Sequence, residues 1–212
     1  MKSVKIILIA LFSSLYLSLN AQVFVGGSFG LSTSGGSNDN WTIKTDKPSS
    51  FNFNFSPRAG KFLFEKLAIG VALNLSYSST KTPGTPETID KTSTYGLSPF
   101  LRYYALKWNK FSLFGQGNIG FSSAMATTKV GGTSTNGPKT TNIYLNVFPG
   151  IAYDLTEKIS LETSINVLNF GYNLSTIKNG NAKNKTSNFG MGAGIDNIVT
   201  SGNITVGAIY KF

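Results

Sequence analysis

The sequence contains neither cysteine nor histidine. Without cysteine, the chain cannot form disulfides, cysteine-based zinc sites or a lipid attachment through a thiol. Without histidine, Ser-His-Asp and Cys-His catalysis, histidine–metal sites and histidine proton shuttles are excluded. We therefore expect a protein that is not an enzyme and that carries no metal and no cofactor.

Charge is also scarce, and long apolar runs are nearly absent. Charged residues make up 13% of the chain, the formal net charge is +10, and the hydrophobic content of 41% is too low for a helical membrane protein. One apolar run, Ile6 to Leu19, follows Lys2 and Lys5 and is shorter than the roughly 20 residues that a spanning helix needs. This pattern predicts a cleaved signal peptide at residues 1–21 before a single domain at 22–212, the alternative being an amino-terminal membrane anchor.

The mature chain is rich in glycine and phenylalanine, and its residues alternate between apolar and polar. In Phe51 to Phe55, for example, three phenylalanines alternate with Asn52 and Asn54. A period of two indicates a β-strand with one apolar face. Eight segments show the pattern: Gln22–Leu31, Phe51–Phe62, Leu67–Tyr77, Thr94–Lys107, Phe111–Phe121, Asn142–Leu155, Ile159–Phe170 and Asn203–Phe212.

Long polar connections alternate with short ones along the chain. Four long connections are rich in Ser, Gly, Asn and Lys and are expected as loops: 32–50, 78–93, 122–140 and 171–201. Each strand supplies the roughly 9–11 residues that cross a bilayer at a tilt. The expected fold is therefore all-β: an eight-stranded antiparallel up-and-down transmembrane β-barrel with short periplasmic turns and long extracellular loops.

The alternation alone leaves open which face of the wall meets the surroundings. A secreted soluble ligand-binding barrel would turn the apolar rows inward. A membrane barrel turns them toward lipid, and the apolar rows are too uniformly large to fill one narrow interior. Aromatic residues near strand ends, such as Tyr95, Trp108 and Tyr210, suit the membrane interfaces.

Three strands share a proline at the same place. The repeat aligns three segments on Pro57, Pro99 and Pro149: Phe55–Phe62, Leu97–Tyr104 and Val147–Asp154. We expect bulges or bends at these prolines, because proline cannot donate to a strand ladder. With the signal peptide and the aromatic closing strand, this repeat resembles the small outer-membrane β-barrel domains of Gram-negative bacteria, the OmpA-like and OmpX-like barrels. The resemblance covers nearly the whole mature chain and implies architecture and an outer-membrane location rather than an activity.

The polar rows include five charged residues: Arg58, Arg102, Asp154, Glu162 and Lys211. In a barrel this narrow we expect charges to pair inside as an ionic filling of the lumen, either Arg58 or Arg102 with Glu162, and Arg102 with Asp154 as a further pair. A catalytic or gating constellation is the alternative. The run Gly115–Gly120 matches G-x-G-x-x-G but lies inside a strand, so it predicts space for larger neighbours rather than a nucleotide site.

The last strand ends in Tyr210 and Phe212, which resemble the carboxy-terminal signal read by the barrel assembly machinery. In the long connections nine lysines outnumber five acidic residues, which suits solvated segments beside anionic lipopolysaccharide. The lysines are too scattered to predict nucleic-acid binding. We expect a monomeric structural or surface-interaction protein among outer-membrane lipids, the alternatives being a narrow pore or solute transporter and a secreted soluble barrel.

Overall fold

The computed structural model describes residues 22–40, 43–165, 168–193 and 204–212; the expected signal peptide at residues 1–21 lies outside this part of the chain. Within it, no helix is long and apolar enough to cross a membrane. The described residues form ten strands: β1 (Val23–Asn40), β2 (Ile43–Phe64), β3 (Leu67–Thr82), β4 (Thr88–Trp108), β5 (Phe111–Val130), β6 (Thr133–Asp154), β7 (Ile159–Ile165), β8 (Leu168–Asn179), β9 (Ala182–Ala193) and β10 (Ile204–Lys211).

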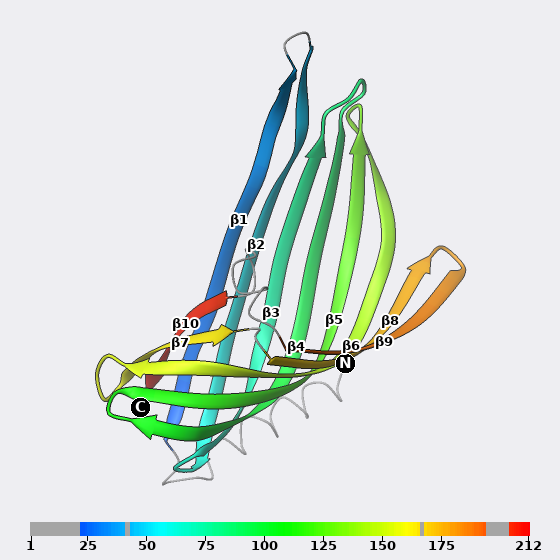
Figure 1. The fold of residues 1–212 in the computed structure, drawn as a ribbon. Helices are drawn as coiled ribbons and strands as arrows, with labels where there is room; N and C mark the ends of the chain where they lie inside the picture. Colours follow the sequence, from blue (N-terminus) through cyan, green and yellow to red (C-terminus); the bar gives the residue numbers. More distant parts are fainter. Residues whose placement is uncertain (1–21, 41–42, 166–167, 194–203) are drawn as a thin grey trace.

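Eight of these strands close into a ring. Neighbours β1 to β7 pair in chain order, and β10 pairs with both β7 and β1, always antiparallel. The short connections 65–66, 109–110 and 155–158 lie at one end of the ring, the short-turn end. There every strand of the ring has a paired neighbour on both sides, so no strand edge is exposed. The prediction of an eight-stranded antiparallel up-and-down barrel is confirmed, and Figure 1 shows the long strands rising together from that end.

The seventh predicted strand is divided in two. β7 pairs with β6 near the short-turn end, from Gly150 to Asp154, whereas β8 pairs with β6 farther up, from Lys139 to Val147. Strand β8 continues into a hairpin with β9, which covers much of the segment expected as the fourth loop. In Figure 1 this hairpin leans away from the β1–β2 ribbon.

The four segments expected as long loops are mostly paired strands instead. Paired strands occupy most of them, so β1 with β2, β3 with β4, β5 with β6 and β8 with β9 extend as two-stranded ribbons. Threonine favours extended backbone, and pairing satisfies the backbone polar groups that a loop would leave to water. At the tips of two ribbons the turns use glycines with positive φ: Gly131 (54°) with Gly132 (93°), and Gly180 (57°).

The apolar row faces outward. Along β4, Leu97, Leu101 and Tyr103 are 48%, 50% and 52% exposed, whereas Ser98 and Arg102 between them are buried. The same alternation on the other strands leaves a wide band of exposed Phe, Leu, Ile and Val around the wall. A soluble barrel would turn this row inward, so the observed orientation fits a wall that meets lipid.

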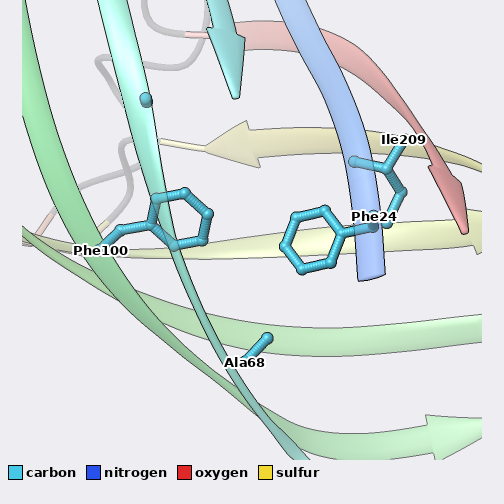
Figure 2. Packing of buried hydrophobic residues seen from close by; sticks show 5 residues of the cluster. Phe24, Ala68, Phe100 and Ile209 are labelled. Carbon is cyan, nitrogen blue, oxygen red and sulfur yellow. The ribbon is translucent and has the colours of Figure 1, made fainter. Parts of the chain in front are cut away.

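A small apolar cluster fills the lumen near the short-turn end. Phe24 of β1, Ala68 of β3, Phe100 of β4 and Ile209 of β10 are buried there, and Figure 2 shows them pointing into the same space. The ring centroids of Phe24 and Phe100 lie 6.4 Å apart. Phe62 and Tyr104 pack against the cluster. Apolar and aromatic side chains therefore block this end of the lumen.

Large inward aromatic residues lie over glycines of the neighbouring strand. The directly opposed pairs are Phe24 with Gly60, Phe100 with Gly70, Phe114 with Gly150 and Tyr144 with Gly120. A Cβ built on any of these four glycines would lie 2.2–2.5 Å from the opposing ring. The run Gly115–Gly120 was expected to make room for larger neighbours, which is confirmed at Gly120 beneath Tyr144 but not at Gly115, where nothing lies within 4 Å of an added Cβ.

The three strand prolines do not mark bulges. Register shifts occur elsewhere, between Phe62 and Phe64 and between Tyr104 and Leu106, for example. At Pro57 and Pro99 the ladder to one neighbouring strand skips the proline and the residue before it, and the register continues unchanged. At Pro149 the same two-residue gap separates the partners of β7 from those of β8. Each proline thus interrupts one ladder, where its missing N–H would have donated, and leaves the alternation of faces intact.

Candidate functional site in the barrel interior

The sequence contains two arginines, and both side chains reach one carboxylate inside the barrel. Arg58 of β2 places Nη2 at 3.0 Å from Oε2 of Glu162 on β7. Arg102 of β4 donates from Nη1 to Oε1 of the same carboxylate. The structure therefore brings together Arg58 and Glu162, as the sequence suggested, and adds Arg102 to the pair.

Arg102 is fully buried, and four hydrogen bonds hold its guanidinium. Besides the bond to Glu162, Nε and Nη2 donate to Oε1 of Gln116 at 2.8 and 2.6 Å, and Nη1 donates to the Tyr104 hydroxyl at 3.1 Å. The guanidinium carbon also lies 4.1 Å from the centre of the Phe114 ring, within cation–π range. Arg102 is thus fixed in place and has little capacity for another partner.

Arg58 is held less completely. Its Nη2 lies over Gly207 of β10, where an added Cβ would approach it to 2.8 Å. Its Nε is buried and has no hydrogen-bond partner among the described residues. Two guanidinium groups face one carboxylate, so the cluster carries one net positive charge.

Asp154 does not pair with Arg102. Its Oδ1 accepts hydrogen bonds from Nζ of Lys211 at 2.8 Å and from the hydroxyl of Ser160. Asp154 is the last residue of β6 and Lys211 the last of β10, with β7 between them, so this pair lies at the short-turn rim. The expected pairing of Arg102 with Asp154 is corrected: Arg102 lies deeper in the barrel, opposite Glu162.

A partly open cavity of about 790 Å³ lies on the side of the cluster away from the short turns. Its charged lining residues, within the part of the chain that the structure describes, are Arg58, Arg102 and Glu162. Amide side chains from six strands contribute much of the rest: Asn54, Asn74, Asn118, Asn146, Asn173 and Asn188. The lumen therefore changes from apolar filling to an ionic layer and then to a cavity lined by both amide and apolar residues.

A hydrogen-bonded network crosses this cavity. Oδ1 of Asn74 on β3 accepts from the Ser56 hydroxyl at 2.9 Å, and its Nδ2 donates to Ser98 at 3.0 Å and to the Tyr144 hydroxyl at 3.2 Å. Tyr144 belongs to β6, and its ring passes over Gly120 of β5 to reach β3. The bond from Asn74 to Tyr144 thus links strands that are not neighbours in the ring.

Sequence reasoning missed several of these partners. Gln116, Tyr144 and Lys211 are inward residues on strands that were predicted correctly, but nothing in a strand pattern indicates which inward residues meet across a lumen. Among the described residues, no group of three or more His, Asp or Glu residues could hold a metal ion.

The aromatic residues at the chain end lie at the same rim as Asp154. Tyr210 and Phe212 meet edge to face with ring centroids 5.0 Å apart, and the Phe212 N–H donates to the carbonyl oxygen of Val23 at 2.9 Å. This contact joins the last residues of the barrel to β1 and so completes the ring. Their role as an assembly signal stays a prediction.

Comparisons with known proteins support the architecture. No protein-family model matches the chain, and no curated protein matches it. The outer membrane protein OprG from Pseudomonas aeruginosa is similar in structure, with a TM-score of 0.50 and 12% identity over 91% of this chain and 96% of that one. A major outer membrane protein from Thermus thermophilus (TM-score 0.47, 14% identity, 91% and 100% covered) and Neisserial surface protein A (TM-score 0.42, 19% identity, 90% and 97% covered) are also similar. At these identities the likeness concerns the fold, which is that of the small outer-membrane β-barrels.

Proposed function

We propose that the protein is a non-enzymatic integral barrel of the bacterial outer membrane with an envelope-integrity or surface-interaction role. Residues 1–21 would direct its export as a signal peptide and then be cleaved. The apolar band on its outer wall and its outer-membrane-type fold support the location. The plugged lumen supports a role outside the barrel rather than through it.

The observation that carries this proposal is a graded outer face on β6, β8 and β9. Directly opposed residues of antiparallel strands point to the same face, so the register defines rows across the three strands. Rising from the membrane region, the rows are Val147–Phe170–Met191, Leu145–Tyr172–Phe189, Ile143–Leu174–Ser187, Thr141–Thr176–Lys185 and Lys139–Lys178–Lys183. The wall thus changes from apolar to hydroxyl to cationic within a few residues.

Lysines directly opposite each other on neighbouring strands repel, which disfavours such a row unless an anion compensates. No acidic residue belongs to any of these five rows. Elsewhere on the hairpins a lysine has an acidic partner, since Nζ of Lys81 lies 2.7 Å from the Glu87 carboxylate. The lysine rows therefore suit the phosphate groups of lipopolysaccharide at the boundary of the outer leaflet.

The test of this surface role is lipopolysaccharide retention by the purified folded barrel. We expect the double variant Lys178→Gln/Lys183→Gln to retain markedly less lipopolysaccharide than the wild type. Lys81→Gln is the matched control, because it removes one hairpin lysine that already has an acidic partner. Equal retention by all three proteins would contradict the surface role.

A narrow pore is the second candidate, and the cavity of about 790 Å³ is the feature that favours it. Against it, the cavity meets the Arg58–Arg102–Glu162 layer, and the apolar cluster around Phe24 lies beyond that layer. Reconstitution into planar bilayers decides between the two candidates: we expect no reproducible conductance steps, and regular steps would favour the pore. Turnover of lipid A or phospholipid by the same preparation would contradict the non-enzymatic assignment.

A further inference from the structure

The floor of the lumen cavity carries an uncompensated positive charge. Arg58, Arg102 and Glu162 are its charged lining residues among those described, and they sum to one net positive charge. Asp154 and Lys211 form a separate ion pair at the rim, and that pair is balanced within itself. A buried charge without a partner is costly, and a bound anion would remove that cost.

The two arginines differ in their capacity for such an anion. Arg102 is fully buried and committed to Gln116, Tyr104 and Glu162. Arg58 keeps 14% of its side chain exposed, lines the cavity and has a buried Nε with no described hydrogen-bond partner. Its contact with Glu162 runs through Nη2, at 3.0 Å from Oε2. The free hydrogen-bonding capacity of the cluster is therefore concentrated on Arg58.

We propose that Arg58 binds a small solute through a carboxylate or phosphate group at the floor of this cavity. The planar guanidinium fork matches the two oxygens of such a group and can bind them in a bidentate manner. Ser28, which like Arg58 lies against Gly207 and lines the cavity, offers a hydroxyl nearby. A volume of about 790 Å³ is ample for a small organic anion.

The surroundings set the charge and polarity of the ligand. The single net positive charge favours an anion over a cation, and the asparagine side chains of the lining offer further hydrogen bonds to such a solute. The site needs no opening through the barrel, because the cavity is already partly open on the side away from the short turns. The inference concerns the lumen alone and does not depend on the surface role proposed above.

Because the chain has two arginines, a nitrogen-15 NMR spectrum of its arginine side chains contains only two Nε–H signals. The folded protein in detergent micelles is titrated with acetate and, separately, with inorganic phosphate, at an ionic strength held constant with sodium chloride. We expect the Arg58 signal to shift and saturate with at least one of the two probes while the Arg102 signal moves little. A response to acetate alone identifies a carboxylate ligand, and a response to phosphate alone identifies a phosphate ligand.

Two results would overturn the proposal. One is an Arg58 signal that neither acetate nor phosphate shifts saturably. The other is a response of the same size to chloride added in place of the oxyanion, which would show general screening rather than recognition of a planar or tetrahedral oxyanion.

Variants give an independent measurement by calorimetric titration with the same probes. Arg58→Gln removes the charge and the fork and is expected to weaken binding roughly ten- to hundredfold, the range of one or two charge-assisted hydrogen bonds. Arg58→Lys keeps the charge but loses the fork and should give an intermediate affinity, and Lys81→Gln, on a distant hairpin, should bind as the wild type does. Unchanged affinity in Arg58→Gln would contradict the proposal, and if that variant does not fold, the wild-type titration still decides.

Discussion

Glu162 is the residue whose replacement tests the ionic layer most severely. Its carboxylate is the shared partner of Arg58 and Arg102, and its side chain is 2% exposed. The change Glu162→Gln keeps the shape of the side chain and removes the negative charge. The cluster then changes from one net positive charge to two, with Arg102 fully buried and 14% of the Arg58 side chain exposed.

The expected cost follows from the burial of these charges. Removal of one partner from a buried ion pair typically costs about 3–5 kcal/mol, mostly because the remaining charge loses its compensation. Arg102 keeps its bonds to Gln116 and Tyr104, so we expect Glu162→Gln to lower the free energy of unfolding by about 3 kcal/mol, at the lower end of that range. A second change, Arg58→Gln, restores the original net charge, and the double variant should be more stable than the sum of the single effects predicts.

Equilibrium unfolding in urea, with the barrel reconstituted in lipid vesicles and followed by tryptophan fluorescence, measures these free energies. Asp154→Asn is the matched control, because it also neutralises the acidic partner of a cation but at the partly exposed rim, where we expect a loss of about 1 kcal/mol or less. A wild-type free energy of unfolding for Glu162→Gln, or strict additivity of the changes at Arg58 and Glu162, would show that the shared carboxylate does not stabilise the two arginines.

Three further changes probe the filling and the outer wall of the barrel in the same unfolding assay. Gly120→Ala places a Cβ 2.2 Å from the Tyr144 ring and should cost about 1–3 kcal/mol, whereas Gly115→Ala, with nothing within 4 Å of the new Cβ, should be nearly neutral. Equal effects at the two glycines would contradict the packing. Tyr144→Phe removes the bond from Asn74 and should cost about 1 kcal/mol, and no loss would show that this bond is weak. Leu101→Arg puts a charge on the outward face and should cost about 2–4 kcal/mol, unless that face meets water.

The barrel itself could be predicted from the sequence because the period of two is a local signal. Alternation such as that of Phe51 to Phe55 fixes both the strand and its two faces, and eight such strands with alternating connections imply closure. No such local signal marks where each strand ends. The serine- and threonine-rich stretches after Leu31 and Tyr77 look polar enough for loops, yet they pair as ribbons because a neighbouring strand of similar composition lies beside them.

The candidate site was predictable only in part, for a geometric reason. The alternation shows that Arg58, Arg102 and Glu162 point inward, but the partners inside a barrel depend on the stagger between strands. Asp154 and Glu162 are equally plausible partners of Arg102 in the sequence. The register of β6 and β7 places Asp154 at the rim beside Lys211 and leaves Glu162 to both arginines. The charge imbalance that follows could not be read from the sequence.

The apolar row on the outer wall and the charged and amide residues of the lumen predict which positions of each strand meet lipid. The chain has no cysteine, so single cysteines placed at successive positions of β4, from Leu97 to Tyr103, can each carry one spin label in vesicles without background. We predict that the relaxation enhancement of the spin label by a lipid-soluble relaxant alternates along the strand, strong at Leu97, Leu101 and Tyr103 and weak at Ser98 and Phe100. Strong enhancement at the inward positions, or no alternation along the strand, would contradict a lipid-facing apolar row.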